Sequence, residues 1–299
     1  MNLVVASEIV EALNQGVPVV ALETSIVAQG LPEPYNLRAA LGCEQAIRDS
    51  GAVPATIAVL DGIARVGLAR GEIERLARDR TAVKVSARDL GWAIAQRRTG
   101  ATTVAGTMRL AALAGIRFMA SGGIGGVHQG HPDDVSADLF ELTRSRVAVF
   151  CAGPKMILDI PSTLEHLETR GVPVLGYGTD ELPGFYVRRT GCRLDGRVDN
   201  PDEAASVLRS TWDTGSLGIV IGVPSVADLP GAEETVAAAM ASLGSIHGKD
   251  VTPYLLARVA EISGGASLDF NVDLVIHNAA VAAACAVAWS KLESFPRSS

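Results

Sequence analysis

Short apolar runs rich in β-branched residues alternate along this chain with longer amphipathic segments. The short runs are apolar on both faces, as expected for strands that helices cover on either side. The longer segments carry apolar residues at helical spacing, and several end in glycine, which is typical of helix C-termini. The alternation predicts an α/β fold, namely a three-layer α/β/α sandwich around a mostly parallel, mixed central sheet. Strands are expected within residues 17–26, 55–62, 82–87, 117–123, 146–153, 172–178 and 218–224, with helices in the segments between them.

Beyond Val223 the pattern is helical throughout. Helices are expected at about residues 233–243, 254–261 and 271–292, and the last is rich in alanine, which suits close packing against the sheet or another subunit. No linker or internal repeat divides the 299 residues, and nearly half of them are hydrophobic. We therefore expect residues 1–299 to form a single domain with an additional helical C-terminal part.

Charge and cysteine content narrow the setting. The net charge is −7 without a basic stripe, so neither nucleic acid nor an anionic membrane surface is an expected partner. The N-terminus has no basic leader before an apolar stretch and is not predicted to be a signal peptide. The alanine-rich run Ala279–Trp289 is too short to span a bilayer. The cysteines lack zinc-ligand spacing, which favours reduced thiols in a cytoplasmic protein: Cys43, Cys151, Cys192 and Cys285.

Lys155 is the sharpest candidate for chemistry. The chain has only four lysines against twenty-two arginines, so a plain surface cation here would more often be arginine. Lys155 follows the buried run 146–153, and Pro154 suits the first position of a helix, so we expect Lys155 beside a helix N-terminus. That field and partial burial disfavour the ammonium form, and a neutral amine is a Schiff-base nucleophile. The same place suits phosphate binding, or a lysine that only extends to the surface from a strand end.

Further polar groups lie at other strand and helix ends. Glu23 follows the apolar run 17–22 and is either a general acid or part of a turn cap. Lys84 interrupts an apolar strand, where it either meets an anion such as phosphate or marks an exposed edge strand. The hydroxyls at the next helix start either bind phosphate or cap the helix, with capping favoured: Thr102, Thr103 and Thr107.

The segment 121–138 combines glycines, histidines and acids. Its GGIGG run lacks dinucleotide spacing and leads into His128, so a tight turn or a close backbone approach is favoured over NAD binding. Asp134, Ser136 and Asp138 present hard oxygen ligands that suit magnesium or manganese better than zinc. Capping of the following helix by Asp134 or Ser136 is the simpler interpretation.

The last expected helix carries Asn271 and Asn278, seven residues apart and therefore on one face. Asparagines at this spacing either point into a site or make a hydrogen bond between helices. The second explanation is the commoner one.

Eight blocks that occur in order across nearly the whole chain match one family. They are ALETSIVAQGLPEP, SGAVPATIAVLDGIARVGL, KVSARDL, GATTVAGTM, GGIGGVHQG, DVSADL, CAGPKMILDIPSTLEHLETRGVPVLGY and NVDLVIHNAAVAA. Through them the chain resembles the pseudouridine-5′-phosphate glycosidases. The resemblance implies reversible cleavage of the C–C glycosidic bond of pseudouridine 5′-phosphate to uracil and ribose 5-phosphate. It also implies a divalent ion of the manganese (Mn²⁺) type and a homotrimer.

The family's functional positions map onto this sequence residue by residue. Glu23 is similar to the family's proton donor, Lys155 to its covalent nucleophile and Asp134 to its metal ligand. The substrate-binding positions correspond to Lys84, Val104, His128, Ser136, Ala137, Asp138 and Asn278. The sequence departs from the pattern where Gln29 replaces a common histidine, where Pro154 replaces a common alanine, and in a shorter loop before Asp134.

The chemistry of the bond explains these residue types. A C–C glycosidic bond has no heteroatom to protonate as it leaves, so the two-carboxylate route of ordinary glycosidases does not apply. An opened ribose would instead expose C1′ to Lys155 while Glu23 protonates uracil C5. Two alternative classes share parts of this pattern. One is a Schiff-base sugar-phosphate lyase or aldolase without uracil recognition, and the other is a non-catalytic phosphosugar-binding protein.

Overall fold

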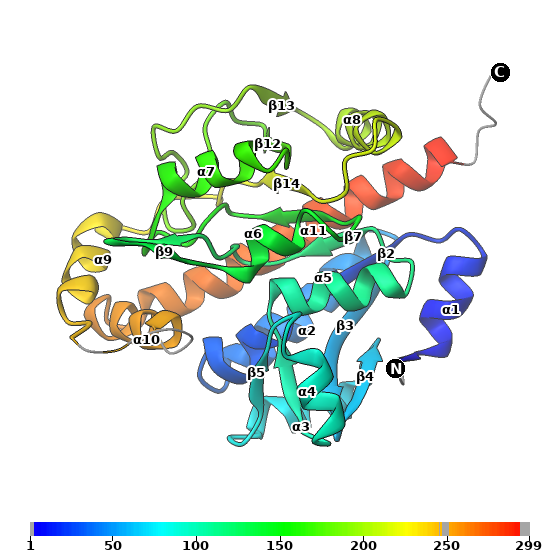
Figure 1. Cartoon of the computed structure of the whole chain (residues 1–299), viewed down its shortest axis with the longest axis horizontal. Helices are drawn as coiled ribbons and strands as arrows, with labels where there is room; N and C mark the ends of the chain where they lie inside the picture. Colours follow the sequence, from blue (N-terminus) through cyan, green and yellow to red (C-terminus); the bar gives the residue numbers. More distant parts are fainter. Residues whose placement is uncertain (1–2, 245, 247–250, 294–299) are drawn as a thin grey trace.

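The computed structural model describes residues 3–244, 246 and 251–293. Eleven strands form one central sheet (Figure 1). They are β1 (Leu3–Val5), β2 (Val19–Leu22), β3 (Val53–Leu60), β4 (Ile63–Val66), β5 (Val83–Val85), β6 (Gly100–Thr102), β7 (Phe118–Ala120), β10 (Ala148–Cys151), β12 (Val174–Tyr177), β13 (Gly196–Val198) and β14 (Ile219–Gly222). The order across the sheet is β1-β4-β3-β2-β7-β10-β14-β12-β13. Two further strands lie outside this order: β6 pairs with both β3 and β5. All pairs from β3 to β13 in the order above are parallel.

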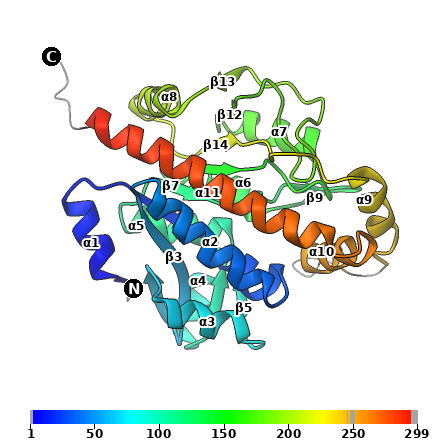
Figure 2. The same cartoon turned by 180° about the vertical axis from the view of Figure 1, so that it is seen from behind.

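Helices cover both faces of this sheet, which confirms the predicted three-layer sandwich (Figure 1 and Figure 2). One face carries α2 (Tyr35–Asp49), α8 (Pro201–Asp213) and α11 (Ala266–Glu293). The opposite face carries α1 (Ser7–Asn14), α4 (Leu90–Ala95), α5 (Val104–Leu113), α6 (Ala137–Glu141) and α7 (Ile160–Thr169). Helix α3 (Arg70–Arg78), in the N-terminal half of the chain, packs beside β3 and β6. Each run expected to form a strand contains one.

Apolar side chains alternate between two cores because successive residues of a strand point to opposite faces. On β2, Val20 and Leu22 belong to the core under α2, α8 and α11, whereas Val19 and Ala21 belong to the core under α5. None of the four is more than 6% exposed. Burying a valine or leucine side chain contributes about 1.5–3 kcal/mol, so the strands that lead into the site are held from both sides.

Strand β3 changes partner halfway along its length. Its first half, Val53–Thr56, pairs in parallel with β2, and its second half pairs antiparallel with β4 and β6. Thr24 closes the join, because its hydroxyl donates to the Ile57 carbonyl at 2.8 Å and accepts from the Thr102 N–H at 2.9 Å. Glu23 lies between the end of β2 and Thr24, so the backbone on both sides of Glu23 is held by the sheet.

The C-terminal part is helical, as predicted, with α9 (Ala232–Ala241), α10 (Val251–Ile262) and α11. The first two helices share a small apolar core with Phe185 and Tyr186. The last helix begins at Ala266, earlier than expected, and is long and apolar enough by composition to cross a membrane. However, 67% of its most apolar window is buried inside the fold, which is the pattern of a core helix.

Two small features near the site were not predicted. A three-stranded sheet is formed by β8 (Val127–His128), β9 (His131–Val135) and β11 (Leu158–Asp159). A single π-helical turn, η1 (Ile26–Gly30), follows β2 after a short connection. β8 and β11 have two residues each, β9 is exposed over most of its length, and η1 is a single helical turn, so none of them has an apolar periodicity that a sequence can reveal.

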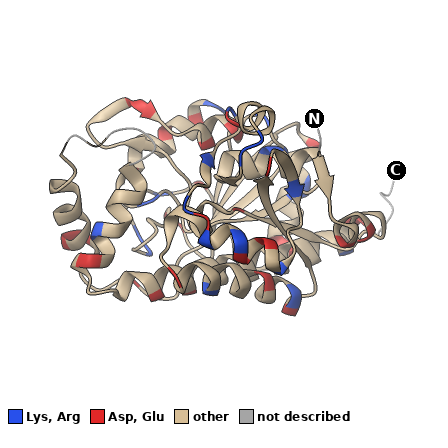
Figure 3. Cartoon of the chain, turned by 90° about the horizontal axis from the view of Figure 1, so that it is seen from below, with Lys and Arg blue, Asp and Glu red and all other residues tan. Residues whose placement is uncertain are grey.

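Charged residues of both signs are interspersed along the elements seen in Figure 3. Many ion pairs are exposed, such as Arg75 with Asp61 at 2.7 Å, and such pairs contribute about 0–1 kcal/mol each. The pair between Arg109 and Glu141 differs, because the Glu141 side chain is only 2% exposed. It joins α5 to α6, which begin at Val104 and Ala137.

Candidate active site

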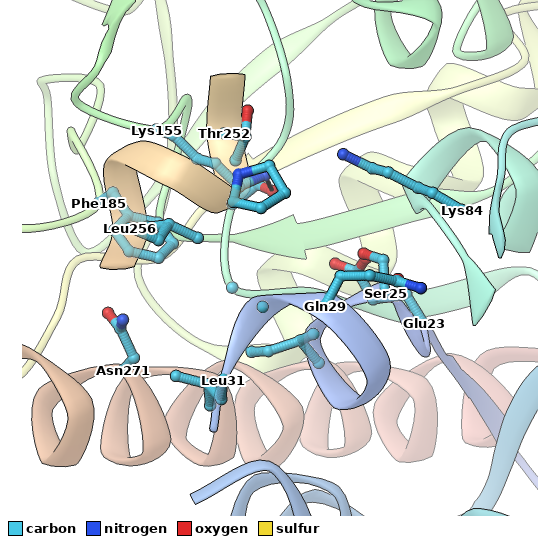
Figure 4. Close-up of a pocket in the computed structure, with 15 residues that line it drawn as sticks. Glu23, Ser25, Gln29, Leu31, Lys84, Lys155, Phe185, Thr252, Leu256 and Asn271 are labelled. Carbon is cyan, nitrogen blue, oxygen red and sulfur yellow. Dashed lines mark hydrogen bonds between the residues drawn. The ribbon is translucent and has the colours of Figure 1, made fainter. Parts of the chain in front are cut away.

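An open cavity lies at the carboxyl ends of three neighbouring strands, β2, β7 and β10, where parallel sheets usually bind ligands. The empty space between its lining residues is about 570 Å³ when the solvent-open part is counted. Glu23 follows β2, Gly122 and Gly123 follow β7, and Lys155 follows β10. Other lining residues come from the η1 turn, β5, α10 and α11 (Figure 4), and they include Ser25, Ile26, Gln29, Lys84, Thr252, Leu256 and Asn271.

Both carboxylate oxygens of Glu23 accept hydrogen bonds from serine hydroxyls. Ser25 donates to Oε2 and Ser121 donates to Oε1. The Ser25 side chain makes no capping hydrogen bond to η1, so the structure does not support the turn-cap interpretation. Two donors from different segments fix the carboxylate in the cavity wall, which a general acid needs for proton transfer in a defined direction.

Lys155 lies in the loop between β10 and β11, and its Nζ donates a hydrogen bond to the Gly123 carbonyl at 2.8 Å. The prediction that Lys155 lies beside a helix N-terminus is wrong. The next helix, α7, begins several residues later, with Asp159 as its N-cap and Pro161 rather than Pro154 in its first turn. Lys155 therefore reaches the cavity from a loop that lies against residues 122–126, the GGIGG run, which we call the glycine segment.

The glycine segment allows three stretches of backbone to approach closely. A Cβ on Gly123 would lie 2.6 Å from the Phe185 ring and 2.9 Å from the Gly153 carbonyl oxygen. Gly153 has a φ of +77°, and a Cβ there would lie 1.8 Å from the Pro183 carbonyl oxygen. Glycine is required at both positions, which supports the interpretation of the GGIGG run as a closely packed turn.

Lys84 is the middle residue of β5, which pairs with β6 at the edge of the described sheet. Strand β5 is thus an edge strand, as one of the two interpretations predicted. The Lys84 side chain is nevertheless half-buried and lines the cavity. Figure 4 shows Lys84 and Lys155 approaching the cavity from different sides, with Glu23 and Ser25 below Lys84 in this view. Two cations around one cavity favour an anionic ligand.

Asp138 connects two helix starts to the glycine segment. Its Oδ1 accepts from the Ala105 N–H in the first turn of α5, and its Oδ2 accepts from the Gly125 N–H, both at 2.9 Å. The N–H of Asp138 donates to the hydroxyl of Ser136, which is the N-cap of α6. The predicted cap is therefore Ser136, whereas Asp134 lies on β9.

The threonine hydroxyls at the start of α5 serve the fold, as the favoured interpretation predicted. Thr103 caps the helix by accepting from the Gly106 N–H. Thr107 donates to Thr102 at 2.8 Å, and Thr102 donates to the Ile57 carbonyl at 2.7 Å. Thr102 and Thr107 are fully buried, so their hydroxyls do not face a ligand.

Val104 and Ala137 are the first residues of α5 and α6. Neither of their N–H groups has an acceptor among the residues that the structure describes. Because an aliphatic side chain offers no polar contact, these two predicted substrate-binding residues can bind a phosphate only through the backbone N–H.

His128 and Asp134 lie on the hairpin of β8 and β9. The Nδ1 atom of His128 is 3.0 Å from the Asp134 carbonyl oxygen and 3.5 Å from Oδ2. The Asp134 side chain is 48% exposed, and no group of three or more His, Cys, Asp or Glu within the described residues is arranged to hold a metal. Asp134 can offer one carboxylate to a hydrated divalent ion, but the described residues do not form a closed metal site.

Asn278 supports the site from behind. It is fully buried on α11, and its Nδ2 donates to the Ser121 carbonyl at 2.9 Å. This bond reaches a loop rather than another helix, which the sequence did not indicate. Asn271, two turns earlier on the same helix, lines the cavity directly.

Buried groups near the cavity remain in their neutral form. Burial raises the pKa of the Cys151 thiol, at the end of β10, to about 11. Burial also raises the pKa of Tyr186 to about 12. A protonated thiol is a poor nucleophile, so Cys151 does not compete with Lys155. All four cysteines are free, as the sequence predicted.

Several lining residues had no signal in the sequence. Phe185 is a non-glycine residue with a φ of 64°, and it packs over the glycine segment. Thr252 and Leu256 reach the cavity from α10. These contacts join segments far apart in the chain, and no local pattern marks them. The Ser121 hydroxyl was visible only as part of a glycine-rich motif.

The fold places the chain in a known class of α/β proteins. The family described as indigoidine synthase A like protein matches residues 8–288. The prealnumycin C-glycosynthase AlnA, solved in complex with ribulose 5-phosphate, superposes with a TM-score of 0.88, is 38% identical and covers 98% of both chains. An indigoidine synthase A-like protein from Thermotoga maritima has a TM-score of 0.89, is 31% identical and covers 96% of both chains.

Curated relatives narrow this class. A pseudouridine-5′-phosphate glycosidase of Deinococcus radiodurans is 52% identical over an alignment 295 residues long, which covers 95% of this chain and 94% of that protein. One of Clostridium botulinum is 48% identical over an alignment 300 residues long, which covers 97% of this chain and 98% of that protein. The chain therefore belongs to the pseudouridine-5′-phosphate glycosidase family and is an enzyme, which confirms the resemblance seen in the sequence.

Proposed function

We propose that the protein reversibly cleaves the C–C glycosidic bond of pseudouridine 5′-phosphate, giving uracil and ribose 5-phosphate, through a Schiff base between Lys155 and the opened sugar. The observation that carries the proposal is the single cavity in which Lys155, Lys84 and the hydrogen-bonded carboxylate of Glu23 meet. The names of relatives about half identical to this chain support the substrate. The ribulose 5-phosphate bound to AlnA supports a pentose phosphate as the sugar.

The reaction begins with opening of the ribose ring. The lone pair of uracil N1 pushes through the base, and the C1′–O4′ electron pair leaves with O4′, which takes up a proton. C1′ is then an electrophile conjugated with the base. The amine of Lys155 adds its lone pair to C1′, the electron pair returns to N1, and the proton that leaves the lysine nitrogen passes to the Glu23 carboxylate. The cavity holds C1′ near the amine, because Lys155 is fixed to the Gly123 carbonyl.

Cleavage of the C–C bond follows proton transfer to the base. Glu23 gives its proton to uracil C5, which becomes tetrahedral. The C1′–C5 electron pair then restores the C5=C6 double bond, while the lysine nitrogen forms an iminium with C1′. Water hydrolyses the iminium to ribose 5-phosphate and the free amine. Ser25 and Ser121 aim the carboxylate at C5 through this sequence.

The phosphate is held at the other end of the cavity. Lys84 lines the cavity and supplies a positive charge. By the family resemblance, the N–H groups of Val104 and Ala137 supply hydrogen-bond donors from two adjoining helix starts, although neither residue is among those that line the cavity. Asp138 and Ser136 keep these starts together, and Asn278 holds the turn between the phosphate and Glu23. By the same resemblance, His128 on β8 is also a substrate-binding residue. Binding energy from the phosphate thus orients the sugar for reaction.

The metal, the assembly and the location follow from the resemblance alone. A manganese ion at Asp134 would stabilise negative charge on the uracil oxygens. We derive no step through it, because the described donors amount to a single carboxylate. By the same resemblance we propose that the enzyme works as a homotrimer of single-domain chains in the cytoplasm.

Release of uracil tests the proposal against its alternative. A Schiff-base lyase or aldolase would share Lys155 and Lys84 but would not release uracil from pseudouridine 5′-phosphate. Incubation of the purified enzyme with that nucleotide and manganese, followed by chromatography, should show uracil and ribose 5-phosphate in equal amounts. Incubation of the two products should regenerate the nucleotide. The absence of uracil under both conditions would reject the assignment.

A further inference from the structure

Gln29 presents a buried hydrogen-bond acceptor at the candidate active site. Its side chain lines the cavity together with Glu23 and Lys84 (Figure 4). The Nε2 group donates to the Ala82 carbonyl at 3.0 Å. The carbonyl oxygen, Oε1, is buried and has no hydrogen-bond partner within the described part of the chain.

The contact with Ala82 decides which end of the amide faces which way. A backbone carbonyl can only accept, so the group opposite Ala82 must be the NH₂ group of Gln29. The other end of the amide is therefore an oxygen, which can only accept. A buried acceptor without a donor is unfavourable, so the arrangement suits a donor that arrives with a ligand.

Gln29 lies between the groups that hold the two ends of the proposed substrate. Its partner Ala82 directly precedes β5, which carries Lys84 and thus the phosphate end. On the other side, η1 connects Gln29 to Ser25, which donates to the Glu23 carboxylate at the uracil end. The part of the substrate between its phosphate and uracil C5 is the sugar.

We propose that Gln29 Oε1 accepts a hydrogen bond from the C2 hydroxyl of the sugar, and that it thereby selects ribose over 2-deoxyribose. This inference rests on the proposed function. The C2 hydroxyl is the donor next to C1′, the atom that bonds to Lys155 and to uracil C5. The N1–H and N3–H groups of uracil are separated from C5 by other ring atoms and lie farther from the sugar. A site that pairs with a hydroxyl rejects the analogue that lacks it, because its acceptor stays unpaired.

Calorimetric titration with two sugar phosphates tests the proposal. Wild-type enzyme should bind ribose 5-phosphate about 10- to 100-fold more tightly than 2-deoxyribose 5-phosphate. In Gln29→Met, which keeps the length of the side chain, the preference should fall to about 3-fold or less through a loss of ribose 5-phosphate affinity alone. Gln45→Met is the matched control, since Gln45 is an exposed glutamine on α2 outside the cavity, and it should keep the full preference.

Three outcomes would overturn the proposal. Gln29→Met could retain the preference, or lose affinity equally for both sugars, which would reduce Gln29 to a structural tie to Ala82. It could also lose affinity for uracil instead. A parallel assay of uracil release separates this inference from the proposed reaction. If the preference for ribose 5-phosphate depends on Gln29 but the enzyme releases no uracil, the proposed reaction is rejected and the role of Gln29 is kept. If the enzyme releases uracil but the preference does not depend on Gln29, the role of Gln29 is rejected and the proposed reaction is kept.

Discussion

The Nζ of Lys155 lies 2.8 Å from the carbonyl oxygen of Gly123, two residues after the serine that donates to Glu23. The proposed nucleophile and the proposed proton donor are thus positioned by one short stretch of backbone, residues 121–123. A displacement of this stretch would move both groups together. Side-chain substitutions in it should therefore affect catalysis more than binding of the sugar phosphate.

The first prediction concerns the covalent bond to Lys155. Borohydride reduction in the presence of ribose 5-phosphate should add one pentose phosphate to the peptide that contains Lys155, detected by mass spectrometry. Lys155→Ala should lose labelling and at least about 1,000-fold in uracil release. Lys155→Arg should be equally inactive, because a guanidinium stays protonated and cannot form an imine. Lys291→Ala, a surface lysine at the end of α11, is the control and should behave as wild type.

The label also locates the chemistry. A pentose phosphate found on Lys84 or Lys291 would reject Lys155 as the nucleophile while leaving the substrate assignment intact. Uracil release that survives in Lys155→Arg would do the same.

A second prediction concerns Lys84 at the phosphate end of the cavity. Lys84→Ala should raise the KM for pseudouridine 5′-phosphate by about 10- to 100-fold, because a charge-assisted contact to the phosphate is lost. The wild-type enzyme should turn over unphosphorylated pseudouridine poorly. Steady-state kinetics with both substrates measure the two effects. Equal turnover of nucleoside and nucleotide would mean that Lys84 has no part in phosphate binding.

A third prediction concerns the two serines that hold Glu23. Ser121→Ala should lower kcat by about 10-fold and leave KM nearly unchanged, because the carboxylate loses one of its fixed donors. Ser25→Ala should act in the same direction. Ser206→Ala on the exposed side of α8 is the matched control. A rise in KM without a change in kcat would show that Ser121 serves substrate binding instead.

A fourth prediction concerns the metal. Chelation should abolish uracil release, and manganese should restore it better than zinc, because the ligands offered at Asp134 are hard oxygens. Asp134→Ala should lose activity while its circular dichroism spectrum stays that of the wild type. Asp133→Ala, the neighbouring exposed carboxylate on β9, should remain active. Full activity of the wild type in excess chelator would show that the reaction needs no divalent ion.

The meeting of Glu23 and Lys155 could be anticipated from the sequence, because each follows a buried run and parallel strands end at one edge of a sheet. The approach of Lys84 was implied by the family resemblance alone, because β5 runs antiparallel to the strands that carry the other two residues. The surroundings of Lys155 could not be anticipated. Pro154 and Pro161 both suit the first turn of a helix, and only the pairing of β11 with β8 decides that the helix begins at the second. Such pairings depend on residues distant in the chain, which a local pattern does not contain.

The same limit explains the serine donors and the support from α10 and α11. Ser121 and Glu23 are 98 positions apart, and their contact follows from the pairing of β2 with β7 rather than from any motif. Helical periodicity did predict the last helices, because their apolar faces repeat over several turns. Periodicity does not tell which side chain of those helices enters a cavity, so Thr252 and Leu256 were not anticipated.

The contact of Asn278 has a consequence for folding of the enzyme during its synthesis. The Ser121 carbonyl that it holds belongs to a residue made 157 positions earlier. At about 5–20 residues per second, a ribosome needs roughly 8–30 s to cover that distance. Throughout this interval the sheet core that includes Phe118 and Phe150 lacks its α11 cover, and the turn beside Glu23 lacks its anchor. We therefore expect the nascent chain to become active only after its final helix has emerged and docked, and we expect the apolar face under α11 to be exposed until then.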